Sequence, residues 1–260
     1  MTTPARPHPG LGVLAAEIAD LPPLEPLLVT PSGAQITGFP ADSDTGPDWW
    51  RRLRDAYPRS GLWPLLMDDD AFECLEDPYT YATVEESLAQ AYTLDGAALL
   101  AEFGDRSLRD YSPEYAAEIR AELASDGRWP EQPEQPGLGL RHDGNGRPLA
   151  ITVALVPAAE PWLVPVTLHY GGWNGYPDPA EHAAIMRHWL DRYGAEPMIW
   201  TGTALDYTVT RPPLTRPEAL ALAWKYRQYN DGEYDLYRAE TLTDLAAGLL
   251  NAPVWRMWWD

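Results

Sequence analysis

A proline- and glycine-rich segment, residues 127–148, most strongly constrains how this chain can fold. Prolines occur at every third position from Pro130 to Pro136, and four glycines follow them. Prolines at this spacing favour a stiff extended backbone, and the glycine-rich end favours a turn. We therefore predict a linker or long surface loop between an acidic α+β region, residues 1–126, and a C-terminal α+β domain, residues 149–260.

The C-terminal domain shows the periodicities of both strands and helices. Apolar residues at every second position predict strands, as where Leu205 and Tyr207 alternate with the polar residues Asp206 and Thr208. A cap residue followed by proline and then glutamate, as in 178–181, predicts the start of a helix. In chain order we expect strands over 149–156 and 164–170, a helix over 178–193, a hairpin of 198–201 with 205–210, helices over 215–229 and 242–250, and a strand over 254–259. The last strand is apolar on both faces, which predicts an interior position in the sheet.

The N-terminal region also mixes the two kinds of element. The expected elements are a helix over 11–20, strands over 27–30 and 35–39, a helix over 48–57 that Pro58 ends, a buried strand over 62–67, and acidic helices up to residue 126. Together the two regions predict an α+β fold in a two-part chain, with helices packed on a mostly antiparallel sheet.

Negative charge is concentrated in one part of the chain. The whole chain carries 19 basic and 39 acidic residues, a net charge of −20. Residues 68–126 hold 16 acidic and 3 basic residues, so this stretch alone has a net charge of −13. Such a field repels nucleic-acid phosphates and anionic lipid surfaces, so we expect neither nucleic-acid nor membrane binding. It attracts basic proteins, and we take Glu114, Glu118 and Glu122 as candidate docking residues. The alternative is a solvated helical face whose charge maintains solubility.

The segment from His169 to Pro177 has the composition of a binding site. It lies between a predicted strand and a helix start, where free backbone N–H groups favour a ligand. Its glycines permit a tight turn, Trp173 offers a stacking face, and Asn174 offers donors and acceptors. The alternative is structural, with Asn174 capping the turn and Trp173 filling the core. The complete set of candidate ligand-binding residues is His169, Trp173, Asn174, Tyr176, Asp178 and His182.

No metal site or cofactor site is predicted. A zinc site needs three or four converging ligands, and His169, Asp178 and His182 could converge only if the strand end folds over the helix. The run Asp68-Asp69-Asp70, with Glu73 nearby, could hold a divalent cation through its oxygens. It lacks the glycine and the spacing of a calcium loop, so a polar turn after a strand is the favoured interpretation. No nucleophile elbow, phosphate loop or dinucleotide fingerprint is present, so no reaction is indicated and it stays open whether the protein is an enzyme.

Several tryptophan-bearing motifs in the C-terminal domain are similar to those of a known family. They are Val153-Ala154-Leu155-Val156-Pro157, Gly172-Trp173-Asn174 with Pro177, His182, Trp189, Tyr193-Gly194-Ala195-Glu196, residues 217–223 and residues 255–260. With these motifs the chain resembles the bacterial family called domain of unknown function 4253. The family pattern has cysteine at the position of Tyr176 and often at that of Asn230. The resemblance therefore implies no thiol or metal role at these two positions, and it brings no established activity.

Two functions remain as hypotheses. The first is a cytoplasmic interaction module for a basic protein, for example a toxin that it neutralises. The second is an enzyme or small-molecule binder that uses the Trp173-Asn174 loop. A deep pocket with His169, Trp173 and His182 on its wall would favour the second, and burial of these residues in the core would favour the first. The lone cysteine, Cys74, excludes an intrachain disulfide and suits the reducing cytoplasm. The oligomeric state is left open.

Overall fold

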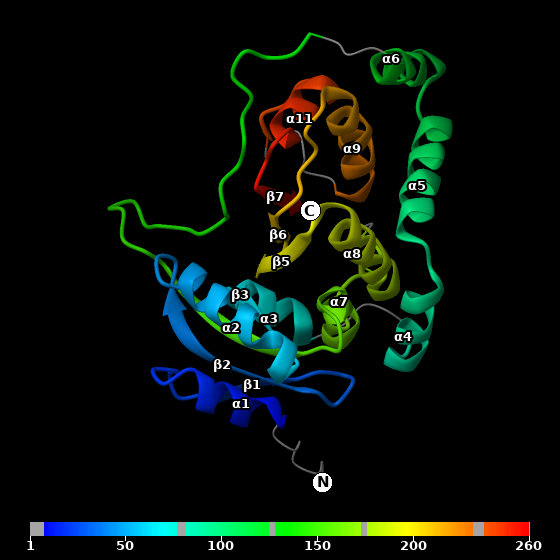
Figure 1. Ribbon diagram of the computed structural model, residues 1–260. Coiled ribbons are helices and arrows are strands. Elements are labelled where there is room, and N and C mark those ends of the chain that lie inside the picture. Colours follow the sequence, from blue (N-terminus) through cyan, green and yellow to red (C-terminus); the bar gives the residue numbers. More distant parts are fainter. Residues whose placement is uncertain (1–7, 77–81, 125–127, 173–175, 231–236, 260) are drawn as a thin grey trace. The chain divides into compact units, whose positions relative to one another are not determined.

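The computed structural model describes residues 8–76, 82–124, 128–172, 176–230 and 237–259 (Figure 1). The chain forms two compact units, each assembled from three separate stretches. The first unit comprises residues 1–93, 140–183 and 197–203, and the second comprises residues 94–139, 184–196 and 204–260.

The strands confirm the predicted α+β class with a mostly antiparallel sheet. Their bounds are β1 (Glu25–Val29), β2 (Gln35–Asp42), β3 (Leu62–Met67), β4 (Ala150–Pro157), β5 (Ala195–Trp200), β6 (Ala204–Val209) and β7 (Val254–Trp258), in the sheet order β1-β2-β4-β3-β5-β6-β7. The pairs β1/β2, β2/β4, β3/β4 and β6/β7 are antiparallel, and β3/β5 is parallel.

The first unit packs helices around β3, whose six residues are all buried. Its helical elements are α1 (Gly10–Glu17), α2 (Gly46–Ser60), α3 (Asp69–Glu76), α4 (Val84–Thr93), the 3-10 helix η1 (Pro161–Leu163), α7 (Val164–Leu168) and the first turn of α8 (Pro179–Tyr193). Helix α2 turns Trp50, Leu53 and Ala56 inward at intervals of three residues. The rings of Trp50 and Tyr57 both meet Trp63 of β3 edge to face, which fixes α2 against the sheet.

The second unit has an aromatic core. Its helices are α5 (Gly96–Asp110), α6 (Pro113–Ala124), the remainder of α8, α9 (Arg216–Tyr229) and α11 (Leu242–Leu249). Figure 1 shows α9 and α11 side by side. Trp189 of α8 is fully buried, and its ring contacts Tyr226 and Tyr229 of α9 and Trp255 of β7. These large side chains account for much of the apolar area that this unit buries.

The strand predicted over residues 164–170 is wrong, because this segment is helical. Helix α7 follows directly on η1, and Pro161 and Pro165 stand in the first turns, where a missing backbone N–H costs nothing. The alternation of apolar residues suggested a strand. The helix is buried on nearly all sides, so apolar residues occur at most of its positions and need not mark one face of a strand. Seven residues are too few for periodicity to separate these two cases.

Two smaller predictions also need correction. Helix α2 does not end at Pro58, which lies inside its last turn; it continues to Ser60 and ends where Gly61 adopts a left-handed conformation, φ 67°. Strand β7 stands last in the sheet order and is therefore an edge strand rather than an interior one. Its alternation explains the error, since Trp255 and Met257 are buried while Arg256 and Trp258 are only half-buried.

The segment between the two predicted regions is irregular over its described residues, 128–148, apart from an isolated bridge between His142 and Pro148. The compact units divide it between Gly139 and Leu140. Strand β4, which follows it, pairs with β2 on one side and β3 on the other. The division of the chain into residues 1–126 and 149–260 therefore stays a prediction, and the compact units follow a different, interleaved pattern.

The alternation of β7 predicts unequal effects of two tryptophan substitutions. Trp255→Ala should lower the free energy of unfolding by about 3–5 kcal/mol, because it empties a fully buried site against Trp189 and Tyr193. Trp258→Ala, on the opposite face of the strand, should cost about 1 kcal/mol. Urea unfolding of both variants measures the difference, and equal losses would contradict the strand orientation.

Candidate functional site

His169 ends helix α7 in a left-handed conformation, φ 57°, which turns the chain away from the helix. Its Nε2 lies 2.9 Å from the carbonyl oxygen of Ala82, so this nitrogen carries the proton that it donates. The other ring nitrogen, Nδ1, is buried and has no hydrogen-bond partner among the residues that the structure describes. The side chain thus ties the end of α7 to the segment just before α4.

A tight turn follows His169. Gly171 has φ 123° and Gly172 has φ 86°, and residues other than glycine rarely adopt this backbone region. The N–H of Gly172 donates to the carbonyl oxygen of Pro177 at 3.0 Å. A Cβ atom at Gly171 would lie 2.3 Å from that same oxygen and 2.9 Å from Cδ2 of His182. Glycine at this position therefore permits the approach of Pro177 and of helix α8.

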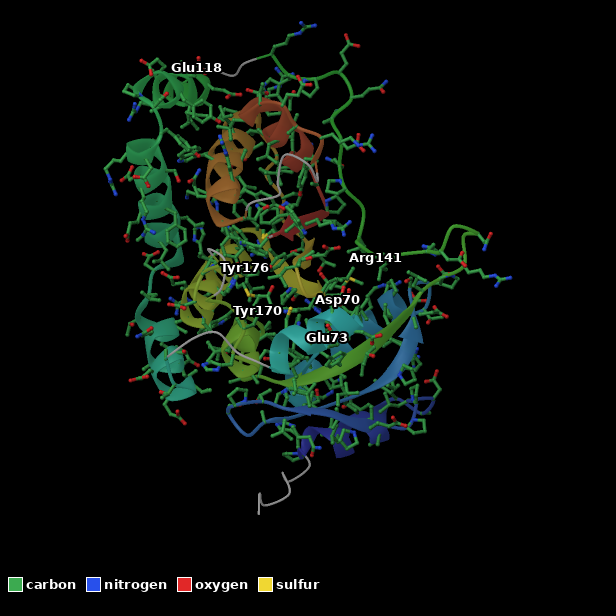
Figure 2. All side chains as sticks on the ribbon, turned by 180° about the vertical axis from the view of Figure 1, so that it is seen from behind. Asp70, Glu73, Glu118, Arg141, Tyr170 and Tyr176 are labelled. Carbon is green, nitrogen blue, oxygen red and sulfur yellow. The ribbon has the colours of Figure 1, made fainter. Side chains whose placement is uncertain are left out.

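The turn assembles a buried cluster of aromatic rings around Tyr170, which we call the Tyr170 cluster (Tyr170, Tyr176, His182 and Trp200). Ring centroids lie 5.9 Å from Tyr170 for Tyr176, 5.5 Å for His182 and 4.7 Å for Trp200. Figure 2 shows Tyr170 and Tyr176 beside each other in the interior. Burial lowers the pKa of His182 to about 3, so its imidazole is neutral at physiological pH.

The structure brings some of the predicted site residues together and separates others. Tyr176 and His182 meet in the Tyr170 cluster, whereas His169 is engaged with Ala82. Asp178 lies before α8 with an exposed side chain, and its N–H donates to Glu181 at 3.0 Å as in a capping box. It therefore does not share the buried environment of His182. Trp173 and Asn174 lie outside the described residues.

The described neighbours of His182 include the rings of Tyr170 and Tyr176. A cavity of about 480 Å³ in the first unit has neither His169 nor Tyr176 nor His182 among its lining residues. Within the described part of the chain no three His, Cys, Asp or Glu side chains gather closely enough to hold a metal ion. What the cluster offers chemically is a neutral imidazole and tyrosine rings in a water-excluded core.

The comparisons with known proteins bear on this part of the chain. Residues 152–260 match the family described as Domain of unknown function (DUF4253). The resemblance predicted from the tryptophan-bearing motifs is therefore confirmed for the C-terminal part of the chain. No curated protein and no solved structure matches the chain. Among the described residues, no helix has the length and hydrophobicity of a membrane span.

The matched DUF4253 region contains both positions at which this chain departs from the expected cysteine pattern. Tyr176 is buried in the Tyr170 cluster. Asn230 is buried beyond the end of α9, where its amide nitrogen donates to the carbonyl oxygen of Tyr226 at 2.8 Å. Both replacements are thus accommodated in the interior of this chain, one in each compact unit.

The acidic candidates differ among themselves. Glu114 and Glu118 are exposed on α6, and Figure 2 shows Glu118 at the surface. Glu122 is half-buried, and its carboxylate accepts the N–H of Thr243 at 2.8 Å, at the start of α11. It satisfies one of the free amides of that helix N-terminus, so its contribution is structural. We therefore exclude Glu122 from the candidate docking residues.

A buried ionisable group that the sequence analysis missed is Asp206, only 1% exposed on β6. It accepts the N–H of Gly139, and its carboxylate lies 3.4 Å from Nε of Arg256, its partner in the β6/β7 register. Burial raises its pKa to about 6, although Arg256 and the Gly139 N–H both act in the opposite direction. The alternation of Asp206 with Leu205 and Tyr207 suggested that its side chain faces solvent. The opposite charge of Arg256 was the signal that could have indicated a cross-strand ion pair.

The buried imidazole of His182 predicts a loss of stability in acid. Its pKa in the folded chain is below the ordinary value of 6.5, so the neutral form stabilises the fold above that pH and the contribution is lost as pH falls toward 3. His182→Gln should therefore lose less stability than the wild type between pH 7 and pH 4. Thermal melts across this range measure the effect, with the exposed His142→Gln as control. Identical pH profiles for His182→Gln and the wild type would refute it.

Asp206 predicts the opposite pH dependence. Its pKa is raised from 3.8 to about 6, so the folded chain holds this proton more strongly than the unfolded chain, and stability falls as pH rises from 4 to 6. Asp206→Asn keeps an acceptor for Gly139 and removes the charge. Relative to the wild type, we expect it to gain about 2 kcal/mol between pH 4 and pH 7. Denaturant unfolding at these two pH values gives the difference, and a pH-independent difference would show that burial does not perturb Asp206.

Proposed function

We propose that this protein is a cytoplasmic interaction module that docks a basic protein, for example a toxin that it neutralises, on its acidic surface. The observation that carries the proposal is the charge of residues 68–93, which contain eight acidic and no basic residues. Within this stretch Asp69, Asp70 and Glu73 are exposed on α3, and Glu73 lies three residues from Asp70 and four from Asp69, on the same side of the helix. We call these three residues the α3 acidic surface. Figure 2 shows Asp70 and Glu73 on this helix.

The negative potential of the α3 acidic surface contributes to raised pKa values at two neighbouring groups. Burial raises the pKa of Asp68 and Asp70 raises it further, while the N–H of Ala71 and the charge of Arg141 act in the opposite direction. Burial also raises the pKa of the Cys74 thiol, and the charges of Asp70, Asp68 and Glu73 add to the effect. The same potential would attract a basic side chain and speed the encounter with a basic protein. A protonated Cys74 is a poor nucleophile, which argues against thiol chemistry here.

The Tyr170 cluster supports the same choice. A small-molecule site on the Trp173-Asn174 loop would need its neighbours to line a cavity. Tyr176 and His182 are instead buried among rings, and Asp68 is occupied in capping α3 through the N–H of Ala71 at 3.0 Å. Asp69 and Asp70 lie in the first turn of α3, where negative charge favours the helix, and they are exposed together with Glu73. We assign these exposed carboxylates to binding.

Affinity capture with charge-matched baits tests the proposal. The wild type, Asp70→Lys/Glu73→Lys, and the control Glu25→Lys/Glu160→Lys are immobilised and exposed to a lysate of the native host. The two variants carry the same net charge, and all four substituted residues are exposed. A specific partner should be retained by the wild type and the control, lost by the α3 variant, and released by about 1 M salt, which shortens the screening length to about 3 Å.

Basic proteins that adhere to any acidic bait should be retained equally by both variants. If every protein captured by the wild type is retained equally by the α3 variant, the α3 acidic surface is not the docking site. Glu114→Lys/Glu118→Lys, against Glu131→Lys/Glu240→Lys, examines the second exposed acidic pair in the same assay. Loss of a partner with Glu114→Lys/Glu118→Lys alone would move the site to α6.

A further inference from the structure

The first unit contains a cavity of about 480 Å³ that the proposed docking surface does not include. Val84 and Leu88 of α4 form one part of its wall, and Leu163 and Val166 from η1 and α7 form another. Leu88 is 39% exposed, although leucine side chains are usually covered. The volume falls within the range of small-molecule sites, about 300–1,000 Å³.

The polar groups of the cavity are few and uncharged. None of its described lining residues is Asp, Glu, Lys or Arg, and the polar ones are His8, Ser32 and Thr167. The Nδ1 atom of His8 accepts the N–H of Gly10 at 3.1 Å, so in the neutral ring the proton is on Nε2. Burial lowers the pKa of His8, which favours this neutral form. The wall therefore offers hydrogen bonds to a ligand but no counter-charge.

We propose that this cavity binds an uncharged, mainly apolar small molecule of about the size of two or three aromatic rings, with His8 as a hydrogen-bond donor. An anionic ligand would lose its hydration and meet no cation in the wall. A cationic ligand would likewise meet no carboxylate there. The site is distinct from the α3 acidic surface, since the two share no residue.

Two fluorescent probes with the same ring system test this assignment. N-phenyl-1-naphthylamine is uncharged, and 8-anilino-1-naphthalenesulfonate adds one sulfonate to the same rings. Titration of the wild type should show saturable binding of the uncharged probe at one site, and binding of the sulfonate at least tenfold weaker. Absence of saturable binding of the uncharged probe, or equal affinity for both probes, would overturn the proposal.

Substitutions in the wall locate the bound probe. Leu88→Glu places a charge in the cavity, and Leu214→Glu is the matched control at a leucine that is 71% exposed in the second unit. Ala159→Trp fills the cavity from an exposed lining position. We expect at least tenfold weaker probe binding for Leu88→Glu and Ala159→Trp, with unchanged melting temperature, and wild-type binding for Leu214→Glu. Equal binding by Leu88→Glu and Leu214→Glu would place the probe elsewhere and refute the site.

The outcome is separable from that of the docking proposal. Asp70→Lys/Glu73→Lys should bind the uncharged probe as the wild type does, since neither residue lines the cavity. If Leu88→Glu loses the probe and still retains the partner, the cavity and the α3 acidic surface are independent sites. If the wild type binds the probe but captures no partner, only the cavity proposal stands.

Discussion

The first unit depends on strand β4, which is hydrogen-bonded on both sides. It pairs with β2 through Thr37↔Leu155 to Asp42↔Ala150 and with β3 through Leu62↔Pro157 to Met67↔Thr152. Its central residues, Val153 to Val156, have no exposed surface. Strand β4 lies between two strands that precede it in the sequence by about a hundred residues. The sheet of the first unit is therefore complete only when residues beyond the irregular segment pair with β2 and β3. This arrangement also fixes where η1 and α7 begin, and with them the wall of the cavity and the Tyr170 cluster.

The sequence predicted elements well wherever two local signals agreed. Helix α9 begins at the expected cap, with the Thr215 side chain accepting the N–H of Glu218, and α8 ends where Gly194 has φ 61°. Residues 164–168 carried only one signal, a short alternation, and burial on nearly all sides produced it in a helix. Strand β7 was mispredicted because the half-buried Trp258 on its outer face made both faces of the strand apolar, as in an interior strand. Burial arises from tertiary contacts, so a single sequence reveals it only indirectly.

The candidate site shows the same limit at the level of single residues. The residue types of segment 169–177 predicted a binding site, which stays a prediction, and the glycines at positions 171 and 172 do permit a close turn. What the types could not show is that His182 and Tyr176 would face inward, or that Glu122 would be used by the N-terminus of α11. The burial of Asp206 could not be predicted for a related reason. A polar position in an alternating strand normally faces water, and only Arg256 across the sheet and the backbone of Gly139 make its burial tolerable.

Net charge connects the two proposals. A chain with a net charge of −20 attracts cationic partners over distances of about a Debye length and repels anions over the same range. The proposed docking on the α3 acidic surface would use this attraction, because its carboxylates are exposed. The cavity of about 480 Å³ differs from the acidic surface in its charge. Its described lining residues carry no charged side chain, so an uncharged ligand experiences neither attraction nor repulsion, and its affinity should depend little on salt. Docking at the surface and binding in the cavity should therefore differ in their response to ionic strength: the first should weaken steeply, and the second should stay nearly constant.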